Sequence, residues 1–539
     1  MASYELKNRA AQTLHEVGQA QNSNDRDDLD LARVGKKSVL KRNFGVLSIL
    51  GFSCTIIATW EGLMDTFLIP MENGGPATAV YGYIFAWIGT GCCFVLLAEL
   101  SSMAPTSGGQ YHWCAMLAPP SCMKFLSYIT GWLTVIGWQS AFASTAFLSG
   151  TEIQGAAILA HERYNAEPYQ GTLIMWASIA LALGVNLVGG KLLPRLENLV
   201  LVLHILGFLA VLIPLTYMSD HKTAKEVFTT WTNEGGWSSN GIVFFLGMQG
   251  GIFAFAGGDA AVHMAEEVQN ASVTIPRAII MTILINGTLG FGMLIAVLFC
   301  MGDLDAALET PTGYPFMQIF YQATNSLPGS LTMISIMLII GLCATIGMLA
   351  ATSRQFWSFA RDQGIPGWRL WSKVSPTSSI PIYSVVLTMT VASLLGLINI
   401  GSDVALNDVV SMAVSGLYLS YLSVGTLLLY RRVTGAIYDH ESDIPSSFNS
   451  PTTTVNVPGS PLVWGPFRVP GILGIAVNVF AIIYMIIVIF FSFWPTEAVV
   501  DYTTMNYSVV STFGTVIIAV VYYFIRAKDV YRGPIIETM

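Results

Sequence analysis

Charged side chains are scarce in this chain of 539 residues: Asp, Glu, Lys and Arg together make up 11% of it, whereas hydrophobic residues make up 53%. A soluble domain usually carries about 25% charged residues, because water must solvate its surface. The shortage of charge therefore excludes an ordinary soluble protein. Apolar runs of about 20 residues, each long enough to cross a bilayer, recur along the chain and predict an all-α membrane protein.

The chain also lacks the residue patterns of an enzyme or a metalloprotein. Its seven histidines are scattered without paired ligand spacing and no nucleophile motif is present, so we expect no catalytic residue, metal or cofactor. The seven cysteines fall within apolar runs or in a loop on the reducing side, which excludes a disulfide framework. The net charge of −8 comes from acids in loops and in the N-terminal segment, so no nucleic-acid partner is implied.

Twelve apolar segments are expected to be membrane-spanning helices. They lie at about residues 44–70, 77–102, 124–150, 171–189, 196–218, 240–262, 277–301, 329–351, 381–400, 407–430, 470–494 and 506–526. Cytosolic loops are enriched in Lys and Arg. With the N-terminus in the cytosol, every Lys and Arg except Arg163, Lys222 and Lys225 falls on the cytosolic side. The sequence therefore predicts twelve spans in the lipid bilayer, with both termini cytosolic.

The predicted spans divide the chain into five regions. Residues 1–43 are polar and mixed in charge, and we expect a disordered cytosolic tail. Residues 44–430 hold helices 1 to 10 and residues 470–526 hold helices 11 and 12. The Ser-, Thr- and Pro-rich segment 431–469 is expected to be a flexible cytosolic loop. Residues 527–539 form a second cytosolic tail, and the cytosolic tails are candidate contacts for the ubiquitination machinery.

The sixth apolar segment is interrupted at Gly257-Gly258-Asp259. Two adjacent glycines weaken a helix, and a carboxylate within hydrocarbon costs about 2.5–3.5 kcal/mol on insertion scales. Non-helical backbone at membrane depth is tolerated where it lines a cavity or is buried in protein, so this break predicts a solute site. The alternative is a Gly-rich kink that only allows close helix packing.

The first apolar segment carries a comparable irregularity, five helices earlier. Thr59, Trp60 and Glu61 lie midway along it, and Asp65 follows Glu61 by one helical turn. Unusual segments at corresponding positions are typical of transporters built from inverted repeats. The alternative is that the two acids lie near the outer end and meet water, which is favoured for Asp65 and left open for Glu61.

Three motifs resemble those of a known family. They are ELSSMAPTSGGQYHW at 99–113, the segment 253–279 around the break, and TSRQFWSFARDQGIP at 352–366. Together they resemble the amino acid–polyamine–organocation transporters, in particular the fungal amino-acid, GABA and choline permeases, over about residues 40–530. The resemblance implies a LeuT-type fold of two inverted five-helix repeats plus two C-terminal helices. It also implies a plasma-membrane permease that works by alternating access and takes up its substrate with the proton gradient.

In this family the substrate lies between the broken centres of spans 1 and 6. The residues expected to bind it are Ala58, Thr59, Trp60, Glu61, Trp138, Phe255, Ala256, Gly257, Gly258 and Asp259. The family's amino-acid carriers usually have Gly-Ser/Thr-Gly where this chain has Ala58-Thr59-Trp60. Aromatic faces beside carboxylates suit a quaternary ammonium group. This favours choline or a related amine, with a zwitterionic amino acid or GABA as the alternative.

His204 is the candidate for proton coupling. The segment leading into span 5 resembles that of proton-coupled relatives, which carry a lysine where this chain has His204. A histidine can supply a removable charge near neutral pH. The alternative is a histidine that only hydrogen-bonds a neighbouring helix.

Charges at the cytosolic ends of the spans predict an inner gate. Its expected members are Glu99, Glu266, Glu267, Arg354 and Arg361. The two arginines are about two helical turns apart and could pair with Glu99 or Glu266. The alternative is that they only set the topology. A nutrient receptor that has lost transport stays open as a further alternative, and the sequence carries no signal for an oligomeric state.

Overall fold

The computed structural model describes residues 27–161, 163–188, 192–400, 405–444, 454–502 and 504–537. Within these residues the chain is mostly helical, and its only strands, β1 (Ile437–Tyr438) and β2 (Leu462–Val463), form one short parallel pair. A bilayer favours this composition, because a helix satisfies its own backbone hydrogen bonds where no water can.

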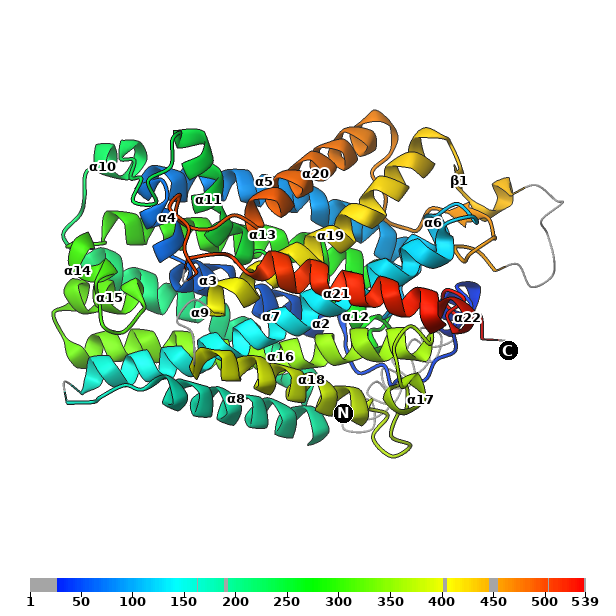
Figure 1. Ribbon diagram of the computed structural model, residues 1–539, viewed down its shortest axis with the longest axis horizontal. Helices are drawn as coiled ribbons and strands as arrows, with labels where there is room; N and C mark the ends of the chain where they lie inside the picture. Colours follow the sequence, from blue (N-terminus) through cyan, green and yellow to red (C-terminus); the bar gives the residue numbers. More distant parts are fainter. Residues whose placement is uncertain are drawn as a thin grey trace, which may run out of the picture.

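The long helices run roughly along one direction (Figure 1). They are α5 (Gly75–Met103), α7 (Met123–Ala160), α8 (Pro168–Val188), α9 (Leu193–Met218), α13 (Ala271–Phe299), α16 (Leu327–Arg361), α18 (Ile382–Leu395), α19 (Ala405–Val433), α20 (Gly471–Ser492) and α21 (Ser508–Tyr522). The shorter elements are α6 (Gln110–Leu117), α10 (Ala224–Thr229), α14 (Leu304–Leu308), α15 (Pro315–Thr324), α17 (Trp368–Trp371), α22 (Lys528–Val530), η2 (Gly396–Ile400), η3 (Glu441–Asp443) and η5 (Tyr523–Ala527).

Two of the predicted spans are interrupted. The first consists of α2 (Val46–Ile57), α3 (Thr59–Asp65) and α4 (Leu68–Glu72). The sixth consists of α11 (Asn240–Phe253) and α12 (Ala260–His263), followed by the turn η1 (Ala265–Glu267).

In the described part of the chain, ten helices are long and apolar enough to cross a membrane, and they coincide with ten of the twelve predicted spans. The other two predictions fall on α7, which has 38 residues, and on α11, which ends after 14 residues. The predicted helical membrane fold is thus confirmed, while the number twelve and the inverted repeat stay predictions.

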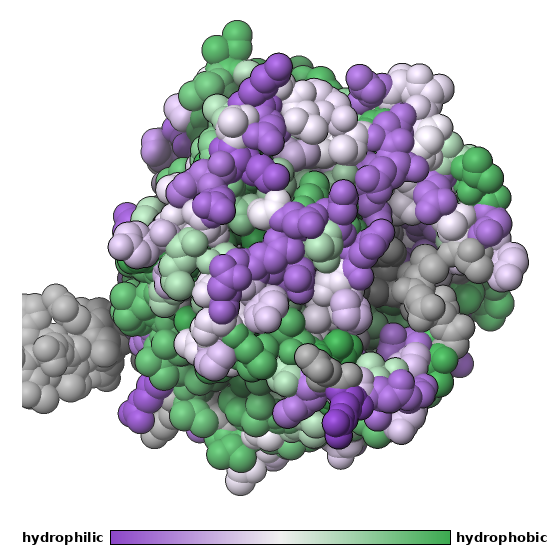
Figure 2. All heavy atoms as spheres, turned by 90° about the vertical axis from the view of Figure 1, so that its left-hand side faces the viewer, coloured by the Kyte–Doolittle hydropathy of each residue, from purple (hydrophilic) through white to green (hydrophobic). Residues whose placement is uncertain are grey.

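The molecule has two different ends. The vestibule end, at the left of Figure 1, carries α10, α14 and α15, and the tail end, at the right, carries α17, α22 and β1. Figure 2 looks onto the vestibule end, where hydrophilic residues gather across the face and hydrophobic residues lie mostly toward the rim. On the flanks, Ile472, Ile517 and Ile525 are 85%, 62% and 73% exposed, which provides an apolar surface for lipid.

The N-terminal segment is more ordered than its composition indicates. Residues 1–43 are predicted to be disordered, yet residues 27–33 are helical and Lys36 is buried against Asp362 at the tail end. The C-terminal segment reaches the same carboxylate, because the backbone N–H of Ile535 donates to it. These polar contacts, together with the buried side chains of Leu31, Val34 and Leu40, hold the segments against the helices.

The predicted flexible loop 431–469 is also partly folded. Its described residues include β1 and β2, and the Asn456 side chain between them donates to the backbone carbonyl of Met103. Residues 445–453 of this loop and residues 1–26 lie outside the described residues.

Candidate functional site

The first break lies at Ala58, between α2 and α3. Its backbone is left-handed, with φ 39° and ψ 52°, a conformation that costs a residue with a side chain about 1–2 kcal/mol. The neighbouring Thr59 N–H, which an unbroken helix would bond internally, donates to Asn286 Oδ1 at 3.1 Å. The irregular residue is therefore the first of the predicted Ala58-Thr59-Trp60 segment.

The second break comprises residues 254–259, between α11 and α12. Gly257 has φ 92°, which is unstrained only for glycine. At Gly258 an added Cβ would lie 1.7 Å from the Phe94 ring, so only glycine fits there. The two glycines of the predicted break are thus required for different reasons, Gly257 by its backbone conformation and Gly258 by the lack of space for a side chain.

Hydrogen bonds join the two breaks. The Thr59 hydroxyl donates to the carbonyl of Ala254 at 2.9 Å, and the Thr66 hydroxyl donates to the carbonyl of Gly250 at 3.2 Å. Segments far apart in the sequence are thereby held side by side at the middle of the molecule.

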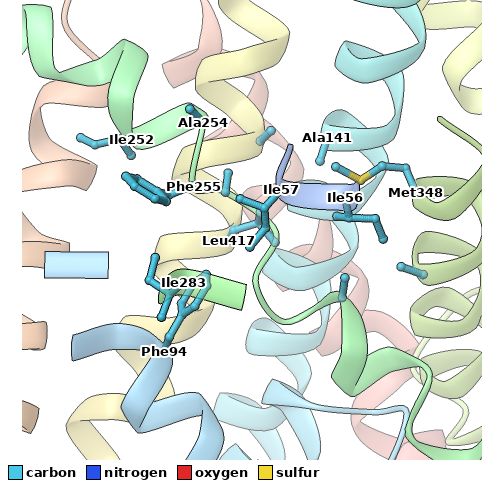
Figure 3. Packing of buried hydrophobic residues seen from close by; sticks show 14 of the residues in the cluster. Ile56, Ile57, Phe94, Ala141, Ile252, Ala254, Phe255, Ile283, Met348 and Leu417 are labelled. Carbon is cyan, nitrogen blue, oxygen red and sulfur yellow. The ribbon is translucent and has the colours of Figure 1, made fainter. Parts of the chain in front are cut away.

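A cavity of about 60 Å³ lies beside these breaks. Its walls come from α2, α3, α7, α11 and α16 and from the second break. Ile56, Ala141 and Met348, from three of these helices, lie together in Figure 3 and form part of the apolar wall.

The cavity leads into a larger vestibule of about 590 Å³. Asp65, Leu148 and Phe253 line both spaces, so they mark the passage between them. The vestibule is also lined by residues of α4 and by the segment 311–314 before α15, which places its mouth at the vestibule end.

Three carboxylates line the cavity, those of Glu61, Asp65 and Glu152. Glu61 is 5% exposed, and its Oε2 has no hydrogen-bond partner. Asp65 and Glu152 lie against each other across the cavity, from α3 and α7. Of the described residues, no Lys or Arg lines either the cavity or the vestibule, and no His, Cys, Asp or Glu group is arranged to hold a metal ion. The cavity is therefore suited to a cation.

Sequence reasoning missed two of these acids. Asp65 was expected to meet water, but it lies at the passage with its Oδ1 buried and unpaired. Glu152 lies beyond the expected end of the third span at residue 150, because α7 continues to Ala160. The sequence did indicate that Glu152 faces the same side as other polar residues of this helix. Thr145, Ser149 and Glu152 follow helical spacing, and all three line the cavity.

Three of the ten predicted substrate-binding residues line the cavity, namely Ala58, Glu61 and Ala256. The lining does not include the other seven, which are Thr59, Trp60, Trp138, Phe255, Gly257, Gly258 and Asp259.

The predicted aromatic faces pack elsewhere. The Phe255 ring packs against Tyr83 at 5.2 Å between centroids and points away from the cavity wall in Figure 3. Trp60 is fully buried, with Phe208 at 6.2 Å. Among the described residues only Phe253 contributes an aromatic ring to the cavity. Trp60 and Phe255 thus fill spaces between helices, and their predicted contact with the substrate stays a prediction.

His204 lies beside the acid of the first break. Its Nδ1 is 2.8 Å from Glu61 Oε1, and the ring is fully buried. His204 Nε2 and Glu61 Oε2 have no hydrogen-bond partner. The pair therefore keeps one carboxylate oxygen and one ring nitrogen without a hydrogen-bond partner.

Asp259, by contrast, is enclosed by donors. Its Oδ2 accepts from Gln110 Nε2 at 2.5 Å and from Trp138 Nε1 at 3.1 Å, and its Oδ1 accepts from the Tyr421 hydroxyl at 2.5 Å. Because these donors come from α6, α7 and α19, the carboxylate ties the second break to three other elements.

His263 completes this enclosure. Its Nε2 lies 3.1 Å from Asp259 Oδ2, and its Nδ1 lies 3.0 Å from the backbone carbonyl of Ser107. Both ring nitrogens of His263 and both carboxylate oxygens of Asp259 therefore have a hydrogen-bond partner.

Ion pairs close the tail end. Arg354 Nε donates to Glu267 at 2.8 Å, and Arg361 donates to both oxygens of Glu266 at 2.7 and 2.9 Å. All four residues are predicted inner-gate members, and the structure joins them as two pairs.

Glu99, the fifth predicted gate residue, has a partner that sequence reasoning missed. It pairs with Arg432 at the end of α19 and accepts the backbone N–H of Val469 at 2.7 Å. A separation of 333 residues gives no local sequence signal for this pair.

Asp362, next to Arg361, makes further hydrogen bonds at the tail end. It accepts from Lys36 Nζ at 2.5 Å and from the Tyr111 hydroxyl at 2.8 Å. Burial alone would raise the pKa of Asp362, but the positive charges of Lys36 and Arg361 outweigh burial and hold that pKa below its ordinary value.

Comparison with known proteins agrees with this architecture. The sequence profile of the amino acid permease family matches residues 44–520. The choline transporter of Saccharomyces cerevisiae is 32% identical over 395 residues, 73% of this chain and 70% of its own length. A provisionally named amino acid/polyamine transporter of Macrophomina phaseolina is 30% identical over 86% of this chain and 98% of its own. An amino-acid permease of Arabidopsis thaliana is 28% identical over 95% of this chain and 96% of its own length. This chain thus belongs to the amino acid permease family of the amino acid–polyamine–organocation superfamily, as a multi-pass membrane transporter and not an enzyme.

Proposed function

We propose that this protein takes up a small organic amine, such as choline, by proton-coupled secondary active transport across the plasma membrane. The observation that carries the proposal is the lining of the cavity, to which Glu61, Asp65 and Glu152 contribute carboxyl groups while no Lys or Arg of the described residues lines it. Opposite charges attract strongly where water is largely excluded. The similarity to a yeast choline transporter supports the same class of substrate.

A zwitterionic amino acid or GABA is the alternative substrate, favoured by the similarity to a plant amino-acid permease. Its carboxylate would need free N–H groups at the first break, because no cationic side chain of the described residues lines the cavity. The Thr59 N–H is already bonded to Asn286. The geometry therefore supports an amine without a carboxylate better.

The two ends of the molecule support alternating access. We assign the tail end to the cytosol, because Lys and Arg gather on that side of the spans. The cavity then opens outward through the vestibule, while the pairs of Arg354 and Arg361 close the inner side. These pairs separate to release the substrate, which a receptor without transport would not require. Protonation of the His204–Glu61 pair changes how strongly the cavity binds a cation, and this couples the uptake of the substrate to the entry of protons.

The test is uptake of radiolabelled choline, GABA and a panel of amino acids in a permease-null yeast, with and without a protonophore. We expect saturable choline or amine uptake that the protonophore abolishes and that Glu152→Gln reduces. Glu309→Gln, an exposed acid near α14, is the matched control and keeps wild-type uptake. Saturable uptake of amino acids alone contradicts the amine proposal, and uptake of none contradicts transport.

The role of His204 is tested with two replacements. His204→Ala is expected to abolish the dependence of uptake on external pH, while His204→Lys, the residue of proton-coupled relatives, retains substrate uptake. If both variants transport with the pH dependence of the wild type, His204 is not the coupling group.

A further inference from the structure

A second buried acid lies on α9, below His204. Glu197 is 1% exposed, and neither of its carboxylate oxygens has a hydrogen-bond partner. It precedes His204 by seven residues, so the two side chains lie on the same face of α9 at a rise of about 10 Å. Glu197 is one turn from the start of the helix at Leu193, and therefore close to the tail end.

Among the residues that the structure describes, none supplies a compensating charge next to Glu197. α9 packs against α2, α13, α15 and α16. The groups that face Glu197 are the Thr55 hydroxyl on α2 and the Cys343 thiol and Gly347 on α16, and no titratable side chain of α13 or α15 acts on it. Arg195, on α9 itself, is exposed.

The contacts around this acid are close. An added Cβ at Gly347 would lie 3.4 Å from Glu197 Oε1, and one at Gly51 would lie 2.4 Å from the Glu197 carbonyl oxygen. The Thr55 hydroxyl donates to the carbonyl of Gly51 at 2.8 Å, so its proton is not available to Glu197. Burying an ionised carboxylate without hydrogen-bond donors in such a site costs nearly the full free energy of removing it from water. Burying the neutral acid costs much less.

We propose that Glu197 is a second proton-binding site of the transport cycle, neutral while α2 and α16 cover it and deprotonated when the tail end opens. Rearrangement of α2 and α16 brings water to the carboxyl, and its proton leaves to the cytosol. The next proton enters from the cavity at Glu61 and His204 and passes down the face of α9 to the Glu197 carboxylate. Each transfer breaks one O–H or N–H bond and forms another: a proton leaving His204 breaks an N–H bond as the O–H bond of Glu197 forms, and a proton released to the cytosol breaks that O–H bond and joins water. This inference rests on the proposed proton coupling and adds the site from which the proton leaves to the cytosol.

The experiment uses full-length protein reconstituted in liposomes and the variant Glu197→Gln, a neutral isostere of the protonated acid. One proton moving down a gradient of one pH unit supports an about tenfold accumulation of substrate. We expect Glu197→Gln to lose this accumulation while choline/choline exchange stays within about twofold of wild type, since exchange needs no net proton transfer. Glu309→Gln keeps both activities. Wild-type accumulation by Glu197→Gln overturns the proposal.

Infrared difference spectroscopy of the same samples provides a readout that needs no substrate. The wild type is expected to show a carbonyl-stretch band of a protonated carboxyl that is missing in Glu197→Gln and present in Glu309→Gln. An unchanged band in Glu197→Gln overturns the assignment of the proton. If the wild type transports no amine but the band is lost in the variant, the proposed function fails while the protonated acid stands.

Discussion

Two buried histidine–carboxylate pairs lie at the two breaks, and they differ in how completely they are bonded. Around Asp259 and His263 every carboxylate oxygen and ring nitrogen has a partner. In the pair of Glu61 and His204, one oxygen and one ring nitrogen have none. Buried polar groups are normally satisfied, so an unsatisfied pair calls for a functional explanation. The comparison teaches that the Asp259–His263 pair, which we call the saturated pair, holds a break in shape, whereas the Glu61–His204 pair, the open pair, has the free polar atoms that the proposed proton coupling requires.

The largest effect is expected from removing the acid of the saturated pair. Asp259→Ala removes the shared partner of four buried side chains, which are Gln110, Trp138, His263 and Tyr421, and breaking this buried cluster is expected to cost about 3–5 kcal/mol of folding free energy. Thermal unfolding in detergent, followed by tryptophan fluorescence, measures the loss. An unfolding temperature equal to that of the wild type would show that Asp259 is not part of a structural pair.

A single donor to the same carboxylate has a smaller effect. Tyr421→Phe removes one hydrogen bond to a charged group and is expected to destabilise the fold by about 1.5–3 kcal/mol. Tyr430→Phe on the same helix is the control, because Tyr430 is 52% exposed. Equal unfolding temperatures for the two variants contradict the enclosure.

The open pair is expected to respond in the opposite manner. His204→Gln breaks one hydrogen bond and lowers stability by about 1 kcal/mol or less. The same variant loses the dependence of uptake on external pH. The comparison fails if His204→Gln destabilises the protein as much as Asp259→Ala does.

The smallest effect is expected at the first break. Ala58→Gly removes the penalty of a left-handed alanine but adds freedom to the unfolded chain, so the net change stays within about 1 kcal/mol. Ala58→Val, which keeps the penalty and adds bulk at the cavity, is the contrasting variant. A stability loss in Ala58→Gly larger than that in Ala58→Val contradicts the left-handed assignment.

The sequence predicts the features that local chemistry determines. Gly257 and Gly258 in an apolar segment predict the second break, and both are required by the backbone path and the Phe94 ring. The motif acids and arginines predict the tail-end charges, and Arg361 does pair with Glu266.

Features that depend on tertiary contacts could not be read from the sequence. Glu152 was placed outside the membrane, because hydropathy ends a span at its first charged residues, whereas α7 continues through the charge. The aromatic residues chosen for the substrate pack between helices, and periodicity cannot tell a packing ring from a ligand-binding one. Lys36 belongs to a segment with the composition of a disordered tail, and its partner Asp362 lies 326 residues away.

The length of α16 has a mechanical consequence. The helix lines the cavity at Met337 and Met348 and continues without interruption to Arg354 and Arg361 at the opposite closure. From Met348 to Arg361 it spans about 20 Å, and a straight helix of this length is nearly rigid. α16 can therefore act as a lever: a small tilt imposed by a solute at its middle becomes a larger displacement of the guanidinium groups at its end.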